Sequence, residues 1–473
     1  MISQTGTRRA PGDPAPWGGF IVLSFCVCLG LVLFLPNLDM YMMQFSTDTF
    51  LSGFGMIDPE KFARYYGLIV SFGLAVGCLL SLTEIPRERV LYIAATTGCA
   101  TALWGSTLAA LSGEFTGGFA FRTPAMLSFF IAVSTAMLTS SGRVRLEHFG
   151  ALFIGATIAA LIKLVYSVLT AASSGGVTIA GNVQAVIGDG QALDLIGFAA
   201  AINLGIAVER MKNQRKIWAF FYFVISLLLV FGLGLSFRRL AMIRSLVVIT
   251  TGFTISGWLL GSTRRHMLVS GVVGATAGLM LFVAGVWYFG EDIFRERLRS
   301  LSLTGRDSGQ FADSNEEYLL HWKIWAEVLW KSKFMGMGFG TGYSGLGPVD
   351  PRTGGAIPLH TGSYELFAST GLVGAGFWLG TLVYLPIHCL RRMKRLKTPL
   401  ESIIGIVAAW TLFLAFFPMM APSFYSPQTA LLVGGSYGFL LNRLAHDVRL
   451  VSSGSIVRPT GLTAGAACVR PRC

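Results

Sequence analysis

The chain has 473 residues, of which 53% are hydrophobic and only 13% are charged, whereas soluble globular domains carry about 25% charged residues. This composition excludes an ordinary water-soluble globular protein and predicts an integral membrane protein. The formal net charge of +13 does not predict nucleic-acid binding, because the basic residues gather at the ends of apolar segments.

Apolar runs of the length that crosses a bilayer as a helix, roughly 20 residues, recur along the chain. We therefore predict an all-α polytopic membrane protein with about 12 transmembrane helices. The first run follows a short start containing Arg8 and Arg9, and it lacks a small-x-small cleavage pattern, so we interpret it as an anchor and not as a signal peptide. The predicted spans are 18–35, 65–82, 90–112, 124–140, 149–169, 192–209, 217–237, 240–260, 267–289, 367–387, 403–418 and 429–442.

The spans divide the chain into four regions. Residues 1–289 hold the first nine spans, and residues 290–366 form a large polar, glycine-rich segment that is too long for a structureless loop. The last three spans lie within 367–442, and a Gly/Ala/Ser-rich tail at 443–473, which we expect to be disordered, follows them.

Charge predicts the orientation of the spans. When the spans alternate across the bilayer, the basic segments 210–216, 262–266 and 389–397 fall on one side. The positive-inside rule assigns that side, with both termini, to the cytoplasm. The segment 290–366 then faces the periplasm at a bacterial inner membrane. None of the seven cysteines lies in an outside segment, which predicts no periplasmic disulfide.

Three arginines run against this orientation. Arg238, Arg239 and Arg244 lie in or just after the outer turn between spans 217–237 and 240–260. An arginine near the bilayer centre costs about 2.5–3.5 kcal/mol on insertion scales. A bound anion would offset that cost, since a guanidinium holds phosphate oxygens in a bidentate way. The alternative is that these side chains reach out to lipid headgroups.

Lys163 and Asp194 are two charged residues of opposite sign within predicted spans. They lie in the outer parts of consecutive antiparallel spans, 149–169 and 192–209. Mutual neutralisation is the structural interpretation. A role for Lys163 in holding an anionic substrate is the alternative.

The outer segment contains an amphipathic helix followed by a glycine strip. In 313–332 an apolar face at helical spacing includes Trp325 and Leu329, and we expect it to pack against the bundle or to meet the membrane interface. Glycines then recur in 336–345, including Gly338 and Gly340. Such a strip allows backbone N–H groups to approach a ligand closely. A flexible loop is the alternative.

His360 stands just before the span at 367–387, on the predicted outer side. A neutral imidazole there can accept a proton from a hydroxyl group. No Cys/His set has the spacing of a zinc site, and no GxxxxGK[ST] loop is present. We therefore expect no metal, no cofactor and no nucleotide site.

Three short motifs resemble one family of bacterial envelope enzymes. In the first motif, His360 and Thr361 are followed by nine residues and then by "GLVG" at 371–374. The second motif, "KFMGMGFGTGY", lies upstream at 333–343, and the third, "LSFRRLAM" at 235–242, lies at the start of a span. Together with the large outer loop before a late span, these resemble the O-antigen ligase and O-antigen polymerase family. Thr361 stands where the family has Asn, Ser or Arg, and two arginines compete for the position in the third motif.

The resemblance implies a C-type glycosyltransferase fold and a metal-independent reaction without cofactor. The donor would be a glycan on undecaprenyl pyrophosphate, with His360 as the base or acceptor positioner. Pyrophosphate would be held by Arg239 together with Arg238, Arg244 or Arg306. Further substrate-binding candidates are Lys163, Gly338, Gly340, Tyr364 and Glu365.

The motifs fit two kinds of glycan acceptor. A ligase of lipopolysaccharide biosynthesis would pass the glycan to lipid A-core, and a polymerase of O-antigen or exopolysaccharide would pass it to another lipid-linked repeat unit. A polytopic transporter, such as a lipid-linked glycan flippase, is a further alternative. The absence of a convincing internal repeat in the sequence argues against it.

Overall fold

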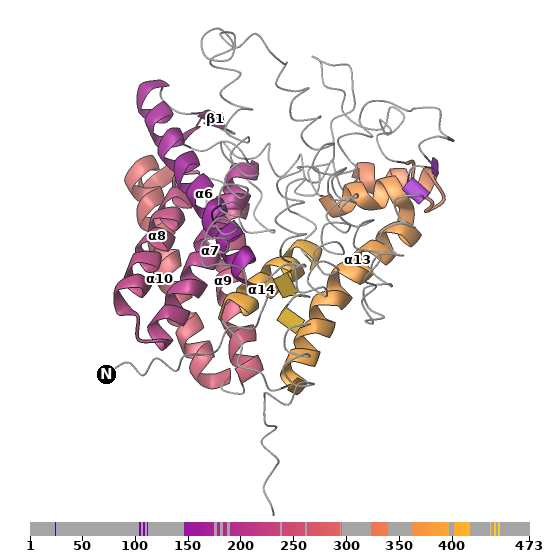
Figure 1. Ribbon diagram of the computed structural model, residues 1–473. Helices are drawn as coiled ribbons and strands as arrows, with labels where there is room; N and C mark the ends of the chain where they lie inside the picture. The colour runs from indigo at the N-terminus through magenta and orange to yellow at the C-terminus, as the bar shows by residue number, and fades with distance from the viewer. Residues whose placement is uncertain are drawn as a thin grey trace, which may run out of the picture.

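The computed structural model describes residues 146–174, 177–179, 183–186, 190–236, 239–260, 263–293, 323–338, 362–396 and 402–416, together with isolated positions near 24, 104–111, 295 and 436–444. Every structural statement below concerns this part of the chain. Figure 1 shows it as a group of long helices standing side by side, with α13 running at an angle beside them.

The described part is helical and has the character of a membrane protein. Four helices are long and apolar enough to cross a bilayer: Gly150–Ser173, Lys216–Gly234, Ala241–Leu259 and Val272–Phe289. This confirms the prediction of a helical membrane protein. The predicted spans before residue 140 and after residue 429 lie largely outside the described residues, so the full count stays a prediction. The helices are α6 (Leu146–Ser174), α7 (Gly190–Lys212), α8 (Lys216–Gly234), α9 (Arg239–Leu260), α10 (Thr263–Phe289), α13 (Gly362–Leu396) and α14 (Ser402–Phe416).

A short β-hairpin between α6 and α7 departs from the purely helical prediction. Strands β1 (Val177–Ile179) and β2 (Val183–Ala185) pair antiparallel, with Val177 opposite Ala185. Both strands contain β-branched residues, which favour extended backbone. The N–H of Val186 donates to the carbonyl of Leu235 at 3.2 Å. The hairpin is therefore attached to the turn that joins α8 to α9.

The basic segments come together at one end of the bundle. Arg210 and Lys212 lie in the last turn of α7, and Lys216 begins α8 after a tight turn. At the end of α13, the ammonium of Lys394 lies 3.9 Å from the ring centroid of Trp258, near the end of α9. The arrangement agrees with the charge pattern of the sequence. Which side of the membrane this end faces stays a prediction.

The centre of the bundle is formed by α7, which contacts α6, α8, α9 and α14. Close approach depends on small residues, as is usual between helices in lipid. A Cβ added at Gly252 of α9 would lie 2.8 Å from the backbone of Ile406 in α14. The core also contains a ladder of aromatic rings from α6, α7 and α14. Phe153 and Phe198 have centroids 5.6 Å apart, and Phe198 and Trp410 have centroids 5.3 Å apart.

Candidate functional site

The site begins with a break in α13. Gly371 has φ 69° and ψ −173°, which is not helical, so a short first segment and a long second segment meet there. Figure 1 shows the two segments running in different directions. A side chain at this position would collide with the backbone of Phe334 and Met335. Glycine is required both by the dihedral angles and by that contact.

The glycine strip docks on this break through its backbone. The N–H of Met337 donates to the carbonyl of Ala368 at 2.8 Å, and the N–H of Gly338 donates to the carbonyl of Ser369 at 2.8 Å. In return the N–H of Leu372 donates to the carbonyl of Phe334 at 3.0 Å. The last carbonyls of a helix have no intrahelical partner. The strip therefore satisfies the groups that the break sets free.

Gly336 makes this backbone contact possible. Its φ is 86°, and a Cβ there would meet the backbone N of Gly371 and lie 2.7 Å from the carbonyl oxygen of Ser369. The strip follows a tight turn in which Lys333 and Phe334 have φ of 50° and 65°. Two glycines with positive φ thus face each other across the junction. We call residues 334–338 and 368–372 together the strip–break junction.

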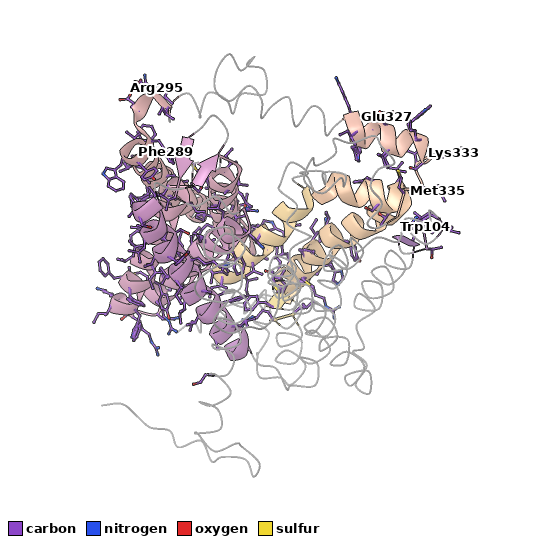
Figure 2. The ribbon with its side chains drawn as sticks, turned by 90° about the horizontal axis from the view of Figure 1, so that it is seen from above. Trp104, Phe289, Arg295, Glu327, Lys333 and Met335 are labelled. Carbon is purple, nitrogen blue, oxygen red and sulfur yellow. The ribbon has the colours of Figure 1, made fainter. Side chains whose placement is uncertain are left out.

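Trp104, from a distant part of the chain, closes the strip–break junction. Its indole Nε1–H donates to the carbonyls of Met335 at 3.2 Å and Thr370 at 3.0 Å. One donor therefore bridges the strip and the end of the first α13 segment. Figure 2 shows Trp104, Met335 and Lys333 gathered at one corner, far from Phe289, the last residue of α10, and from Arg295 beyond it. Trp104 is half-buried, and its N–H finds partners where the ring is covered by protein.

The helical segment 323–331 packs against the first segment of α13 at the junction. Ile324 and Val328 are buried against Ala368 of α13, and the rings of Trp325 and Phe367 meet edge to face at 6.3 Å. The amphipathic face predicted from the sequence, here Trp325 and Leu329, thus packs inward in this part of the chain.

The arginine part of the candidate site lies on α9. Arg239 is its first residue, and Arg244 lies in the next turn. The Arg244 side chain is only 3% exposed, and its guanidinium carbon lies 5.2 Å from the centroid of the Trp410 ring in α14. Arg244 therefore does not reach out to lipid headgroups, as one interpretation of the sequence held. It is enclosed by α9 and α14 and stacks on an aromatic face, as guanidinium groups do.

Lys163 is enclosed in the same way on α6, with 1% of its surface exposed. The side chain of Asp194 lies outside the described residues, so the predicted neutralisation between the two stays untested. A buried ammonium and a buried guanidinium are costly in an apolar bundle. They are the two buried cationic side chains among those that the structure describes.

The remaining predicted site residues divide into three groups. Gly338 is part of the strip–break junction, whereas only the backbone is described for Arg239, Tyr364 and Glu365, the last two within the first segment of α13. The others lie outside the described residues: His360, Arg238, Arg306 and Gly340. His360 stands two residues before the start of α13. Sequence reasoning missed Trp104 and Trp410, for which the sole signal was an indole inside an apolar run.

A further feature of the described part of the chain is the placement of its metal-ligating side chains. Among those that the structure describes, no group of three or more His, Cys, Asp and Glu is placed to hold an ion. No protein-family model matches the chain, and a search among curated proteins finds none with significant similarity. The resemblance to a family therefore rests on the motif residues themselves.

Proposed function

We propose that this protein is an O-antigen ligase-type glycosyltransferase of the bacterial inner membrane, which moves a glycan from undecaprenyl pyrophosphate to an acceptor hydroxyl at the periplasmic face. One observation supports the proposal most. Two of the three motifs that resemble the family, the glycine strip and "GLVG", meet at the strip–break junction, next to the helix that follows His360. Motifs far apart in sequence that share one site are expected of an active centre.

The chemistry needs few groups. The acceptor oxygen attacks the anomeric carbon, the bond from that carbon to the pyrophosphate oxygen breaks, and the acceptor proton passes to the His360 imidazole. Undecaprenyl pyrophosphate leaves with the electron pair of the broken bond. Because pyrophosphate is already a good leaving group, positioning and charge stabilisation supply most of the rate.

The cationic residues of α9 fit the leaving group by their chemistry. Arg239 begins the helix at the end opposite the basic loops, and Arg244 lies deeper, buried against Trp410. Guanidinium groups held in an apolar environment interact strongly with phosphate oxygens. In the proposal Arg239 and Arg244 hold the pyrophosphate, with Arg238 and Arg306 as further candidates, and Lys163 contributes to the same anion.

A reconstituted assay tests this function. Purified protein in lipid vesicles receives a lipid-linked glycan and an acceptor, and the release of undecaprenyl pyrophosphate is measured. His360→Ala is expected to abolish release. The matched control is His388→Ala, which should leave release unchanged. His388 is a half-buried histidine toward the basic end of α13. Equal activity in the two variants would end the proposed role of His360.

The acceptor is decided by the same assay. A lipid A-core acceptor that supports release identifies a ligase, and a second lipid-linked repeat unit that supports it identifies a polymerase. Arg239→Ala should raise the KM for the donor and lower kcat, while Arg391→Ala, exposed near the basic end of α13, should change neither.

A transporter of lipid-linked glycans is the second candidate, and the break in α13 favours it. Discontinuous membrane helices are common at the binding sites of transporters. A labelled lipid-linked glycan in vesicles distinguishes the two functions. Translocation without acceptor and without release of undecaprenyl pyrophosphate would identify a transporter, whereas release that depends on acceptor identifies the transferase.

A further inference from the structure

An exposed apolar patch lies on the outside of the strip–break junction. Trp330, Phe334, Met335 and Leu372 are 74%, 42%, 44% and 45% exposed. Trp330 and Phe334 meet edge to face with ring centroids 6.1 Å apart. The patch belongs mostly to the segment between two spans, not to the face of a membrane helix. Large exposed apolar groups at such a place mark a contact surface.

The position of Leu372 along α13 gives the depth of this patch. Lys394, at the other end of the helix, lies over Trp258 next to the basic turn between α9 and α10. A lysine and a tryptophan at a basic helix end are typical of a membrane–water interface. At a helical rise of about 1.5 Å per residue, Leu372 lies about 33 Å from Lys394 along the helix. The hydrocarbon core is about 30 Å thick, so a helix of this length, inclined as α13 is in Figure 1, brings Leu372 close to the opposite interface.

The other end of α10 gives an independent reference for that interface. α10 starts at the basic end and finishes at Phe289, and its last turn exposes Trp287 and Tyr288. These aromatic residues have the amphipathic rings that are enriched at headgroup level. In Figure 1 the end of α10 and the beginning of α13 both lie toward the upper end of the bundle.

Charge at the patch suits a lipid surface. The described segment 323–338 carries Lys323, Lys331 and Lys333 against a single acidic residue, Glu327. The ammonium of Lys331 pairs with the Glu327 carboxylate at 2.8 Å, and both side chains are exposed. Lysine next to exposed tryptophan and phenylalanine is the composition of interfacial segments that lie on anionic membranes.

We infer that the Trp330–Phe334–Met335–Leu372 patch inserts into the headgroup region of the bilayer and holds the segment 323–338 on the membrane surface. The outer segment is thus attached to the lipid as well as to α13. The strip–break junction then lies at headgroup depth, directly beside lipid.

Fluorescence quenching tests this contact without any knowledge of the activity. The full chain is placed in phosphatidylcholine–phosphatidylglycerol vesicles, and the emission of the Trp330→Phe variant is subtracted from that of the wild type, since the other tryptophans are common to both. The difference signal is expected to be lost with lipids brominated near the headgroup and to persist with aqueous iodide.

Two matched variants calibrate the measurement. Trp287→Phe gives the signal of an exposed tryptophan at a span end, and Trp410→Phe gives that of a tryptophan fully enclosed in protein. A Trp330 signal quenched by iodide and not by brominated lipid would place the patch in water and overturn the inference. A signal quenched by neither, like that of Trp410, would mean that protein covers the patch and would overturn it as well. Should Trp330→Phe fail to insert, Trp330→Tyr yields the same subtraction.

Discussion

Gly371→Ala is expected to separate the glycine strip from α13. Alanine at φ 69° and ψ −173° costs about 1–3 kcal/mol in backbone strain. The added Cβ would also lie 2.5 Å from the carbonyl oxygen of Met335, so the strip must move. The three backbone hydrogen bonds of the junction contribute about 0.5–1.5 kcal/mol each. Together these terms give roughly 3–7 kcal/mol for local opening of the junction.

Limited trypsin digestion in detergent measures this opening, because Lys331 and Lys333 stand beside the strip. A loss of about 3 kcal/mol raises the population of the open state, and with it the cleavage rate, on the order of 100-fold. Gly376→Ala is the control, since a Cβ there meets no atom within 4 Å and alanine favours a helix interior. Equal cleavage rates in the two variants would refute the reasoning.

Three further changes test the bundle and the candidate site. Trp104→Phe removes the donor shared by two carbonyls and should lower the free energy of opening the junction by about 1–3 kcal/mol. Trypsin should then cut this variant faster than the wild type, whereas Trp330→Phe should be cut at the wild-type rate. Similar rates in the two variants would contradict a bridging role for Trp104. Gly252→Ala forces α9 away from α14 and should lower the apparent melting midpoint. Gly278→Ala, with open space around the added Cβ, should leave the midpoint unchanged or raise it. A lower midpoint for Gly278→Ala than for Gly252→Ala would be inconsistent with the packing. Arg244→Met replaces a buried charge by an apolar group, which is often neutral or stabilising by about 1–4 kcal/mol, so we expect an unchanged or higher midpoint with loss of glycan transfer; retained transfer would show that Arg244 is structural.

The long apolar helices were predictable from local sequence. Each of α6, α8, α9 and α10 is an apolar run bounded by polar turns, and in lipid the backbone of such a run must satisfy its own hydrogen bonds. The positions of the basic segments at the helix ends were equally predictable, because charged residues avoid the hydrocarbon region. These features depend on residue type and spacing alone.

The break in α13 could not be predicted in the same way. The stretch "ASTGLVGAGFW" (368–378) has the composition of a continuous membrane helix. Gly371 leaves the helix because backbone groups of the strip (334–338) and the indole of Trp104 supply partners for the freed groups. Those partners come from remote parts of the chain, so no local pattern reports them. The β-hairpin between α6 and α7 was missed because its strands are only three residues long.

The faces of the helical segment 323–331 show the same division. Helical spacing in the sequence identified Trp325 and Leu329 as an apolar face, and both turn inward. Trp330, the residue after Leu329, is instead exposed. Periodicity finds an apolar face, but contact with the first segment of α13 decides which side chains it covers.

The sequence by itself determined that this chain is a helical membrane protein, which ends of its helices are basic, and which histidine, arginines and glycines are candidates for chemistry. Those properties follow from the free energy of single residues in lipid. Only the tertiary structure decided that the glycine strip fills a break in α13 and that Arg244 is enclosed against Trp410. Both depend on contacts between residues far apart in the chain, which exist only once the helices have packed.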